Sequence, residues 1–209
     1  MRKVYITIAV FFGIILTAFS FSWKVNSEAN PLQSAEFAVG DVIFQTSNSS
    51  QSKAIQLATE SQYSHCGMVV RTDGRLMVFE AVQPVKLTPI NEFINRGTNG
   101  YVVKRLKESY GTFPDKEQSE LQTLISRYIG KDYDIYFNWS DEELYCSELV
   151  WKIYDEYLGI ELCKPRPLSD YNLSHPLVKE QLKKRYGSNL PMDEPMVSPQ
   201  DLFESKLLE

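Results

Sequence analysis

Residues 65–82, HCGMVVRTDGRLMVFEAV, contain two apolar runs separated by a short polar segment. The runs at 65–70 and 76–82 are rich in the β-branched and apolar residues that favour strands. Between them lies Asp73-Gly74, a dipeptide that strongly favours the tight turn of a β-hairpin. The stretch therefore predicts two antiparallel strands, with the rest of a sheet formed around them.

The register of this hairpin decides which side chains share a face. If Thr72 faces Arg75 across the turn, His65 and Glu80 become diagonal neighbours on one face of the sheet. Their backbones are then about 7–8 Å apart, within reach of long side chains. A slip of one residue would place the two side chains on opposite faces.

A carboxylate beside a histidine orients the imidazole and stabilises its charged form. Glu80 is unusual because it interrupts the apolar run Val78-Phe79-Glu80-Ala81-Val82. A lone acid in a strand more commonly faces solvent, and a lone histidine is more commonly structural. The two residues become a candidate for chemistry because the expected register places both on one face.

The rest of the chain alternates short strands with helices. We expect strands at 42–44 and 101–106, and helices at 51–59, 113–129, 146–158, 177–186 and from Ser198-Pro199 onward. This pattern predicts an α+β fold with a small antiparallel sheet packed against helices.

Cys146 is the first residue on the apolar face of its predicted helix. That face has helical spacing and comprises Cys146, Leu149, Val150, Ile153, Tyr154 and Tyr157. A thiol in the first turn gains from the helix dipole and from free N–H groups, which favour the thiolate. Its backbone N–H is also placed to stabilise an oxyanion. The alternative is a buried core cysteine, the commoner role of an isolated cysteine on an apolar stripe.

The chain has three cysteines and two histidines, so histidine chemistry must use His65 or His175. Strand alternation points Cys66 to the face opposite His65, and Cys163 lies in a loop with no candidate base near it. A Cys66–Cys163 disulfide is one arrangement that leaves Cys146 as the free thiol. The two distant histidines match no zinc signature, so we expect no metal site.

Arg2 and Lys3 precede an uncharged segment, residues 4–23. A basic start before a long apolar run is typical of a secretory signal or a membrane anchor, and about twenty residues suffice to span a bilayer. We expect residues 1–29 to be a signal peptide or N-terminal anchor and residues 30–209 to form an exported domain in the periplasm or cell envelope. The alternative is a buried N-terminal helix of the domain.

The composition excludes several classes of protein. Of 209 residues, 43% are hydrophobic and 23% are charged, which is ordinary for a globular domain. The chain carries 22 basic and 27 acidic residues, a net charge of −5. An acidic chain without a basic cluster is a poor candidate for binding nucleic acid.

Seven short segments, in the order in which they occur, resemble the circularly permuted papain-like group, the branch of the NlpC/P60 superfamily that includes the YiiX-like proteins. They are Gly40-Asp41-Val42-Ile43-Phe44-Gln45, Ser52-Lys53-Ala54-Ile55-Gln56-Leu57-Ala58-Thr59, Tyr63-Ser64-His65-Cys66-Gly67-Met68, Val78-Phe79-Glu80-Ala81, Gly130-Lys131-Asp132-Tyr133-Asp134, Tyr145-Cys146-Ser147-Glu148-Leu149-Val150 and Val197-Ser198-Pro199-Gln200-Asp201-Leu202. In the unpermuted enzymes the cysteine helix precedes the histidine strand. Here His65 precedes Cys146, which is the permuted order.

The resemblance implies a permuted papain-like catalytic domain with its nucleophile at a helix N-terminus. Cys146 is then the nucleophile, His65 the base and Glu80 the residue that orients the base. Tyr145, directly before the nucleophile, is a candidate for binding the oxyanion or shaping the pocket. No cofactor is implied.

The favoured function is an exported cysteine hydrolase that cleaves an amide through an acyl-enzyme, with cell-wall peptide as the substrate class. One alternative is a hydrolase or acyltransferase acting on lipid acyl groups with the same three residues. Another is a binding module of the same fold without activity. A lipid substrate predicts an apolar rim beside the cleft, and a peptide predicts a polar one. Residues 4–23 would supply membrane attachment.

Overall fold

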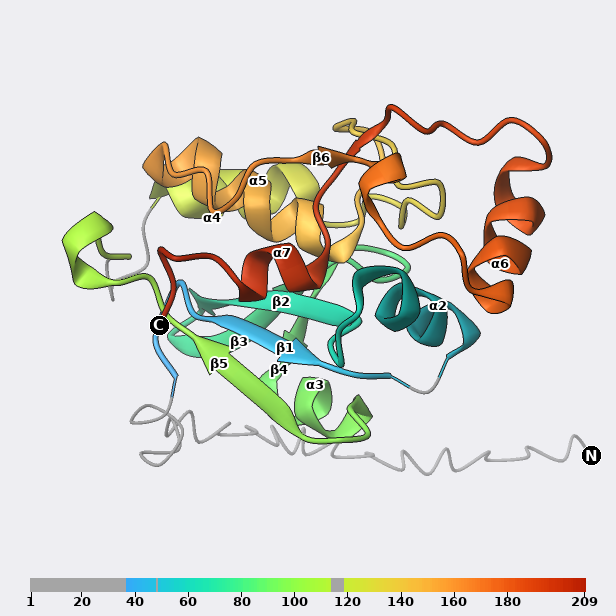
Figure 1. The fold of residues 1–209 in the computed structure, drawn as a ribbon. Coiled ribbons are helices and arrows are strands. Elements are labelled where there is room, and N and C mark those ends of the chain that lie inside the picture. Colours follow the sequence, from blue (N-terminus) through green and yellow to red (C-terminus); the bar gives the residue numbers. More distant parts are fainter. Residues whose placement is uncertain (1–36, 48, 114–118) are drawn as a thin grey trace, which may run out of the picture.

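The structure is a computed structural model that describes residues 37–47, 49–113 and 119–209. Its five-stranded antiparallel sheet has the strand order β4-β3-β2-β1-β5 (Figure 1). The strands are β1 (Val42–Gln45), β2 (His65–Thr72), β3 (Arg75–Glu80), β4 (Lys86–Pro89) and β5 (Tyr101–Lys104), with a separate pair β6 (Arg166–Pro167) and β7 (Pro195–Met196). The helices are α2 (Ser50–Thr59), α3 (Ile90–Arg96), α4 (Ser119–Tyr128), α5 (Cys146–Leu158), α6 (Pro176–Tyr186) and α7 (Pro199–Phe203), with short 3-10 helices η1 (Glu108–Tyr110) and η2 (Leu168–Asp170). This is the α+β fold that the sequence predicts.

The hairpin of β2 and β3 has the predicted register, because Thr72 pairs with Arg75. The turn residues Asp73 and Gly74 have positive φ values of 48° and 73°. Positive φ at both central residues is what the tight turns of hairpins require, and Asp-Gly tolerates it well. The local sequence therefore sets the pairing of the two central strands.

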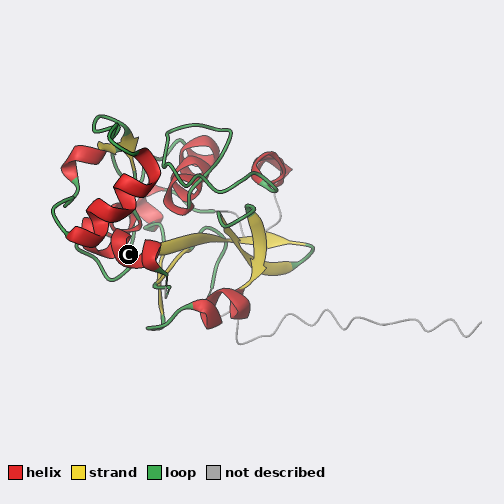
Figure 2. Ribbon diagram, turned by 90° about the vertical axis from the view of Figure 1, so that its right-hand side faces the viewer, coloured by secondary structure: helices red, strands yellow, loops and turns green. Residues whose placement is uncertain are grey.

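Different helices cover the two faces of the sheet. Helix α5 packs on one face, where Cys66 and Met68 of β2 join the main apolar core. Helix α3 packs on the other face, where its Phe93 contacts a smaller core that includes Val69. Figure 1 shows α5 and α7 above the sheet and α3 below it, and Figure 2 shows the same layers from the side. His65, by strand alternation, belongs to the α3 face.

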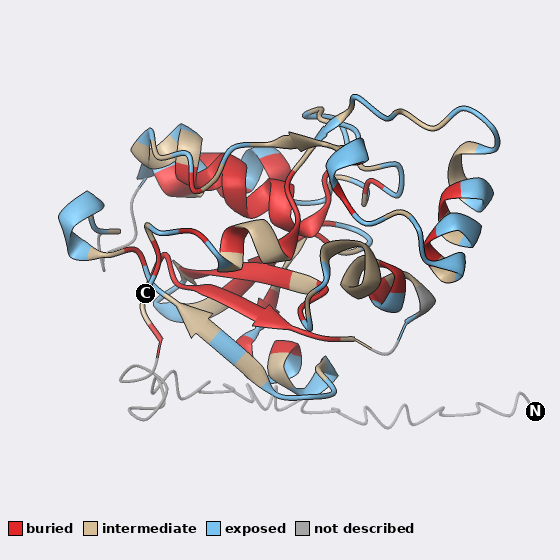
Figure 3. Cartoon of the chain, in the orientation of Figure 1, coloured by how far each residue is buried: buried red, intermediate tan, exposed pale blue. Residues whose placement is uncertain are grey.

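Helix α5 begins at Cys146 and ends before Gly159, as the sequence predicts. Tyr145 precedes the first turn in an extended conformation, and its N–H donates to Oε2 of Glu148 at 3.4 Å. Gly159 ends the helix with a φ of 67°, a conformation that favours glycine. Residues 146–154 are all buried, which Figure 3 shows as the darkest part of the helix layer. Cys146 is therefore held on a firmly packed element.

Helices α2 and α6 pack against each other beside the start of α5. Their contact is a small apolar cluster that includes Ala54, Val178 and Leu182. His175 precedes α6, and its Nδ1 accepts a hydrogen bond from the N–H of Leu177 at 3.2 Å. The second histidine of the chain thus serves as a helix cap.

One predicted helix starts later than expected. In the described residues α4 begins at Ser119, and Phe113 lies outside it, so the predicted start at 113 is wrong. The Phe113 ring instead packs against Tyr154 and Tyr157, with centroids 5.0 and 5.5 Å apart. Residues 114–118 lie outside the described residues.

Strand β4 and helix α3 have no counterpart in the sequence analysis. Strand β4 is an edge strand of four residues that ends in Pro89, and such strands carry little apolar alternation. Helix α3 follows it at once and has only seven residues. Both elements are too short for a periodic pattern, yet they supply partners to the site described below.

The expected signal peptide or anchor at residues 1–29 lies outside the described residues and stays a prediction. Within the described residues, no helix combines the length and apolar character needed to cross a membrane.

Candidate functional site

His65 and Glu80 form a buried pair at one end of β2 and β3. Nε2 of His65 lies 2.6 Å from Oε2 of Glu80. The Glu80 side chain is completely buried, and that of His65 is 14% exposed. The diagonal contact that the register predicts is therefore present, and the alternative of a solvent-facing Glu80 is wrong.

The second carboxylate oxygen of Glu80 is also engaged. Thr88 of β4 donates its hydroxyl to Oε1 at 2.5 Å, and Arg96 of α3 forms an ion pair with the same oxygen. Burial raises the pKa of Glu80, but the hydrogen bonds from His65 and Thr88 and the charge of Arg96 outweigh it, so the pKa falls below its usual value. Glu80 is thus an ionised, fixed acceptor for His65.

Cys146 meets His65 from the opposite face of the sheet. His65 is the first residue of β2 and Cys146 the first of α5, so the two side chains meet at the end of the strand. The imidazole lies within hydrogen-bonding reach of the thiol. Because Glu80 occupies Nε2, the nitrogen left for Cys146 is Nδ1. Phe93 stacks on the imidazole at a centroid distance of 5.6 Å and restrains the ring.

This contact favours a thiolate–imidazolium pair. Burial lowers the pKa of His65, but the hydrogen bonds to Cys146 and Glu80 outweigh it and raise the pKa to about 9. The pKa of Cys146 lies well below its usual value because Cys66 hydrogen-bonds to the sulfur and His65 lies beside it, although burial opposes the shift. The contact therefore favours the thiolate form of Cys146.

Cys66 lies much closer to Cys146 than the sequence analysis suggests. Its side chain points away from His65, as strand alternation requires, into the core cluster that also contains Cys146. Its thiol and its backbone N–H both lie within hydrogen-bonding reach of the Cys146 sulfur. Burial raises the pKa of Cys66 well above its usual value, so it is a neutral donor. The predicted orientation of Cys66 away from His65 is confirmed, and its thiol lies beside Cys146 because Cys146 also lies on the α5 face.

All three cysteines are free, so Cys66 and Cys163 form no disulfide in this structure. Burial raises the pKa of Cys163 to about 12. Among the three thiols, Cys146 is therefore the one whose pKa is lowered rather than raised.

Tyr145 forms part of the wall beside Cys146. It is buried, and its hydroxyl accepts a hydrogen bond from the N–H of Val197 at 3.1 Å. Its ring packs edge-on against Phe137, with centroids 5.2 Å apart. These contacts fix the ring in one orientation.

Tyr133 is a second tyrosine at the site, and no pattern in the sequence predicts a role for it. Burial raises the pKa of Tyr133 well above its usual value, and the nearby charge of Cys146 adds to the effect. Its hydroxyl accepts a hydrogen bond from Nε2 of Gln51 at 3.1 Å, which leaves its own proton available to donate. Tyr133 lies in the short motif at residues 130–134, which ends twelve residues before Cys146. That motif is the one sequence signal that could have identified it.

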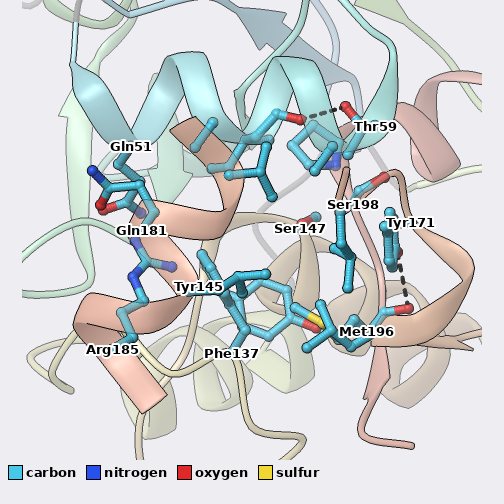
Figure 4. Close-up of a pocket in the computed structure, with 18 of the residues that line it drawn as sticks. Gln51, Thr59, Phe137, Tyr145, Ser147, Tyr171, Gln181, Arg185, Met196 and Ser198 are labelled. Atoms are coloured by element: carbon cyan, nitrogen blue, oxygen red, sulfur yellow. Dashed lines mark hydrogen bonds between the residues drawn. The ribbon is translucent and has the colours of Figure 1, made fainter. Parts of the chain in front are cut away.

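A narrow apolar pocket opens beside Cys146, with a volume of ≈ 90 Å³. Helices α2 and α6, the start of α5 and the segment 196–199 form its walls. Its interior is lined mainly by alanine, isoleucine, leucine, valine and aromatic side chains. Figure 4 shows Tyr145 and Phe137 on one wall, Gln51, Gln181 and Arg185 at one end, and Thr59, Tyr171 and Ser198 toward the other. We call this the apolar pocket.

A wider cleft of ≈ 520 Å³ lies on the His65 side. Its lining includes more hydroxyl, amide and guanidinium side chains than that of the first pocket, although hydrocarbon still forms most of the exposed wall. These polar residues are Gln45, Ser47, Ser49, Gln51, Ser52, Ser64, Gln83, Tyr133 and Arg96. Gln51 and Ile55 of α2 line both cavities. The Cys146–His65 pair therefore lies at the junction of an apolar pocket and this second cavity, which we call the polar cleft.

Three comparisons with known proteins point to the same family. Residues 36–209 match the family described as permuted papain-like amidase enzyme, YaeF/YiiX, C92 family. The chain is 48% identical over 170 residues to the uncharacterized protein YiiX of Escherichia coli strain K12, which covers 81% of this chain and 83% of that protein. It also resembles the crystal structure of YiiX from Escherichia coli O157:H7, with a TM-score of 0.76 and 49% identity over 82% of this chain and 94% of that chain.

That crystal structure is described as one of a metalloprotein. In the described part of the present chain, no group of three or more His, Cys, Asp or Glu side chains is placed to hold a metal ion. The family match includes the whole described domain, and with it the strand that carries His65 and the helix that begins at Cys146. The chain therefore belongs to the permuted papain-like amidases of the YaeF/YiiX type.

Proposed function

We propose that this chain is a cysteine amidase in which Cys146 is the nucleophile, His65 the acid and base, and Glu80 the orienting residue. The proposal rests on one observation. The sulfur of Cys146 contacts an imidazole whose other nitrogen is held at 2.6 Å by a buried carboxylate. Acyl transfer requires a nucleophile in contact with a base, and a third group that orients the base.

The reaction follows from the ionisation of the pair. The Cys146 thiolate attacks the amide carbonyl carbon, and the C=O electron pair moves onto oxygen. As the C–N bond breaks, the proton on Nδ1 of His65 passes to the leaving nitrogen, and a thioester remains on Cys146. His65 then takes a proton from water as the water oxygen attacks the thioester carbon. The C–S bond breaks, the acid leaves, and the Cys146 thiolate and the protonated His65 are restored.

The negative oxygen of the intermediate needs hydrogen-bond donors. The backbone N–H of Cys146, in the first turn of α5, is one donor. The hydroxyl of Tyr133 is the second, because it lies near Cys146 and already accepts its other hydrogen bond from Gln51. We assign Tyr145 to the pocket wall, since Val197 and Phe137 hold it there.

The two cavities assign the two halves of the substrate. The leaving amine departs on the side of the imidazole that protonates it, which is the polar cleft. The acyl group stays on Cys146, which lines the apolar pocket. We therefore call the apolar pocket the acyl pocket. An apolar lining favours an acyl chain over the polar side chains of a cell-wall peptide. The acyl-lipid alternative is therefore better supported, as an amide of a long-chain acid.

The place of action is part of the proposal. A basic start and the apolar segment 4–23 favour export and attachment to a membrane. Attachment would keep the acyl pocket near substrates that carry lipid chains.

Iodoacetamide labelling across pH tests the nucleophile. We expect Cys146 to react at neutral pH much faster than Cys66 or Cys163, because their thiols stay protonated. His65→Ala should slow the reaction at Cys146 and leave labelling of Cys163 unchanged. Peptide mapping by mass spectrometry gives the rate at each cysteine.

A substrate panel tests the reaction. N-Dodecanoyl amides, cell-wall peptides and phospholipids are incubated with the protein, and the acids or amines released are measured. Release of dodecanoic acid, dependent on Cys146, supports the proposal. No release from any amide, with Cys146 reacting no faster than a free thiol, would leave a binding module.

A further inference from the structure

Arg185 places a positive charge at one end of the acyl pocket. It is half-buried and lines the pocket from α6. Its guanidinium lies over the Phe137 ring, 4.7 Å from the centroid. Among the described residues, no carboxylate forms an ion pair with it. The mechanism proposed above makes no use of this cation.

The nearest acids do not neutralise Arg185. The charges of Asp134 and Glu194 raise the pKa of Tyr186, and the charge of Arg185 lowers it. All three charged groups therefore lie near Tyr186. Both carboxylates, however, accept hydrogen bonds from backbone N–H groups of residues 136–139, at 2.5 to 2.7 Å. The two carboxylates therefore bind the backbone of that loop. N–H donors of the Arg185 guanidinium remain available for a ligand.

The surroundings of Arg185 suit an anionic group. Gln51 and Gln181 lie at the same end of the pocket, and Figure 4 shows the three polar side chains gathered there. The remaining walls are mostly apolar, so a charge here is poorly solvated by the protein. A guanidinium beside two amides binds carboxylate or phosphate oxygens well.

This end of the pocket is also the end near the scissile bond. Gln51 donates to the hydroxyl of Tyr133, and Tyr133 lies close enough to Cys146 to respond to its charge. A chain attached to Cys146 would run the other way along α2, toward Thr59. Because Gln51 lines both cavities, this end of the acyl pocket adjoins the polar cleft into which the amine leaves. An anion on the amine half of the substrate, a few atoms from the amide, can therefore reach Arg185.

We propose that Arg185 is an anion-binding residue that selects amides with an apolar acyl chain and a carboxylate or phosphate close to the scissile bond. The position of that bond rests on the proposed function. The selectivity itself is a property of binding and needs no turnover.

The test uses Cys146→Ala protein, which cannot cleave what it binds. Calorimetry compares N-dodecanoylglycine with its neutral analogue N-dodecanoylglycinamide, and N-dodecanoyl phosphoethanolamine with N-dodecanoylethanolamine. We expect the anionic member of at least one pair to bind about tenfold more tightly, as one charge-assisted contact gives. The pair with the larger ratio shows whether the carboxylate or the phosphate is preferred.

Three variants in the same background identify the residue. Arg185→Gln should reduce the anionic preference to near parity, and Arg185→Lys should retain most of it. Lys184→Gln removes the same charge from the neighbouring exposed position, outside the pocket lining, and should leave the ratio unchanged.

Equal affinities for both members of both pairs would overturn the inference. So would an anionic preference that survives Arg185→Gln or disappears equally in Lys184→Gln. If the protein with Cys146 intact hydrolysed no amide, the proposed function would be wrong. The binding ratios measured with Cys146→Ala protein would still test the role of Arg185.

Discussion

The two cavities that meet at Cys146 and His65 differ in size and in the polar share of their walls. The acyl pocket is narrow and lined almost wholly by hydrocarbon, whereas the polar cleft is wide and has hydroxyl and amide groups among its hydrocarbon. One helix, α2, contributes to both. Such a site favours an asymmetric substrate, with an apolar half bound before cleavage by burial and a polar half that leaves into solvent.

The difference also gives the reaction a direction. In the proposed reaction, the acyl half remains in a pocket that shields the thioester, while the amine departs past the residue proposed to protonate it. The same proposal brings water to the thioester from the polar cleft, on the side of His65, the proposed base for the second step. The asymmetry of the walls thus matches the asymmetry of acyl transfer.

The largest predicted effect separates chemistry from binding. Cys146→Ala should lower the hydrolysis rate on the order of 10⁴-fold or more, because no other ionised thiol lies at the junction. Dodecanoyl amides should still bind, since neither cavity depends on the sulfur. Initial rates and calorimetric affinities measure the two effects. Cys163→Ala, outside both cavities, is the control, and a Cys146→Ala rate above one hundredth of normal would point to another nucleophile.

The next effect concerns the polar side of the junction. The pKa of His65 is about 9, so its proton is lost as pH rises through that value and amide cleavage falls. Glu80→Gln removes a charge that helps to raise this pKa. The alkaline limb should move to lower pH, with kcat reduced on the order of 10- to 100-fold.

A pH–rate profile of kcat checks this prediction. Thr88→Val is the milder companion, because it removes one hydrogen bond to Glu80 and keeps the carboxylate. A limb that stays near pH 9 in Glu80→Gln would show that Glu80 does not act through His65.

The His65–Glu80 pair and the position of Cys146 at a helix start could each be predicted from the sequence, because each depends on local structure. The Asp73-Gly74 turn sets the hairpin register, and the register places Glu80 beside His65. The apolar face of α5 begins at Cys146, so its position at a helix start follows from spacing alone. Neither inference needs to know how distant elements pack.

The contact between Cys146 and the His65–Glu80 pair could not be predicted in this way. Strand alternation correctly turns Cys66 away from His65, but Cys146 reaches the imidazole from the far face, at the end of β2. The acyl pocket needs α2, α6 and residues 196–199 to come together. Thr88 and Arg96 stand on elements without a periodic pattern. All of these depend on long-range packing.

A smaller effect tests the division of the substrate directly. Ala58→Phe narrows the acyl pocket, and Val82→Phe narrows the polar cleft. Each excluded methylene costs about 0.8 kcal/mol, so Ala58→Phe should raise KM for dodecanoyl amides about tenfold and for butanoyl amides much less. Val82→Phe should respond to the size of the amine rather than to chain length. A chain-length response in both variants, measured across the same amides, would contradict separate sites for the two halves.

The smallest predicted effect lies at the boundary itself, where Gln51 lines both cavities and hydrogen-bonds Tyr133 at 3.1 Å. One neutral hydrogen bond contributes about 1 kcal/mol, so Gln51→Ala should lower kcat about fivefold. If Gln51 acts by orienting the Tyr133 hydroxyl, the double variant with Tyr133→Phe should be no slower than Tyr133→Phe alone. Additive losses would instead mean that Gln51 contacts the substrate itself, and that the two cavities form one continuous binding surface along α2.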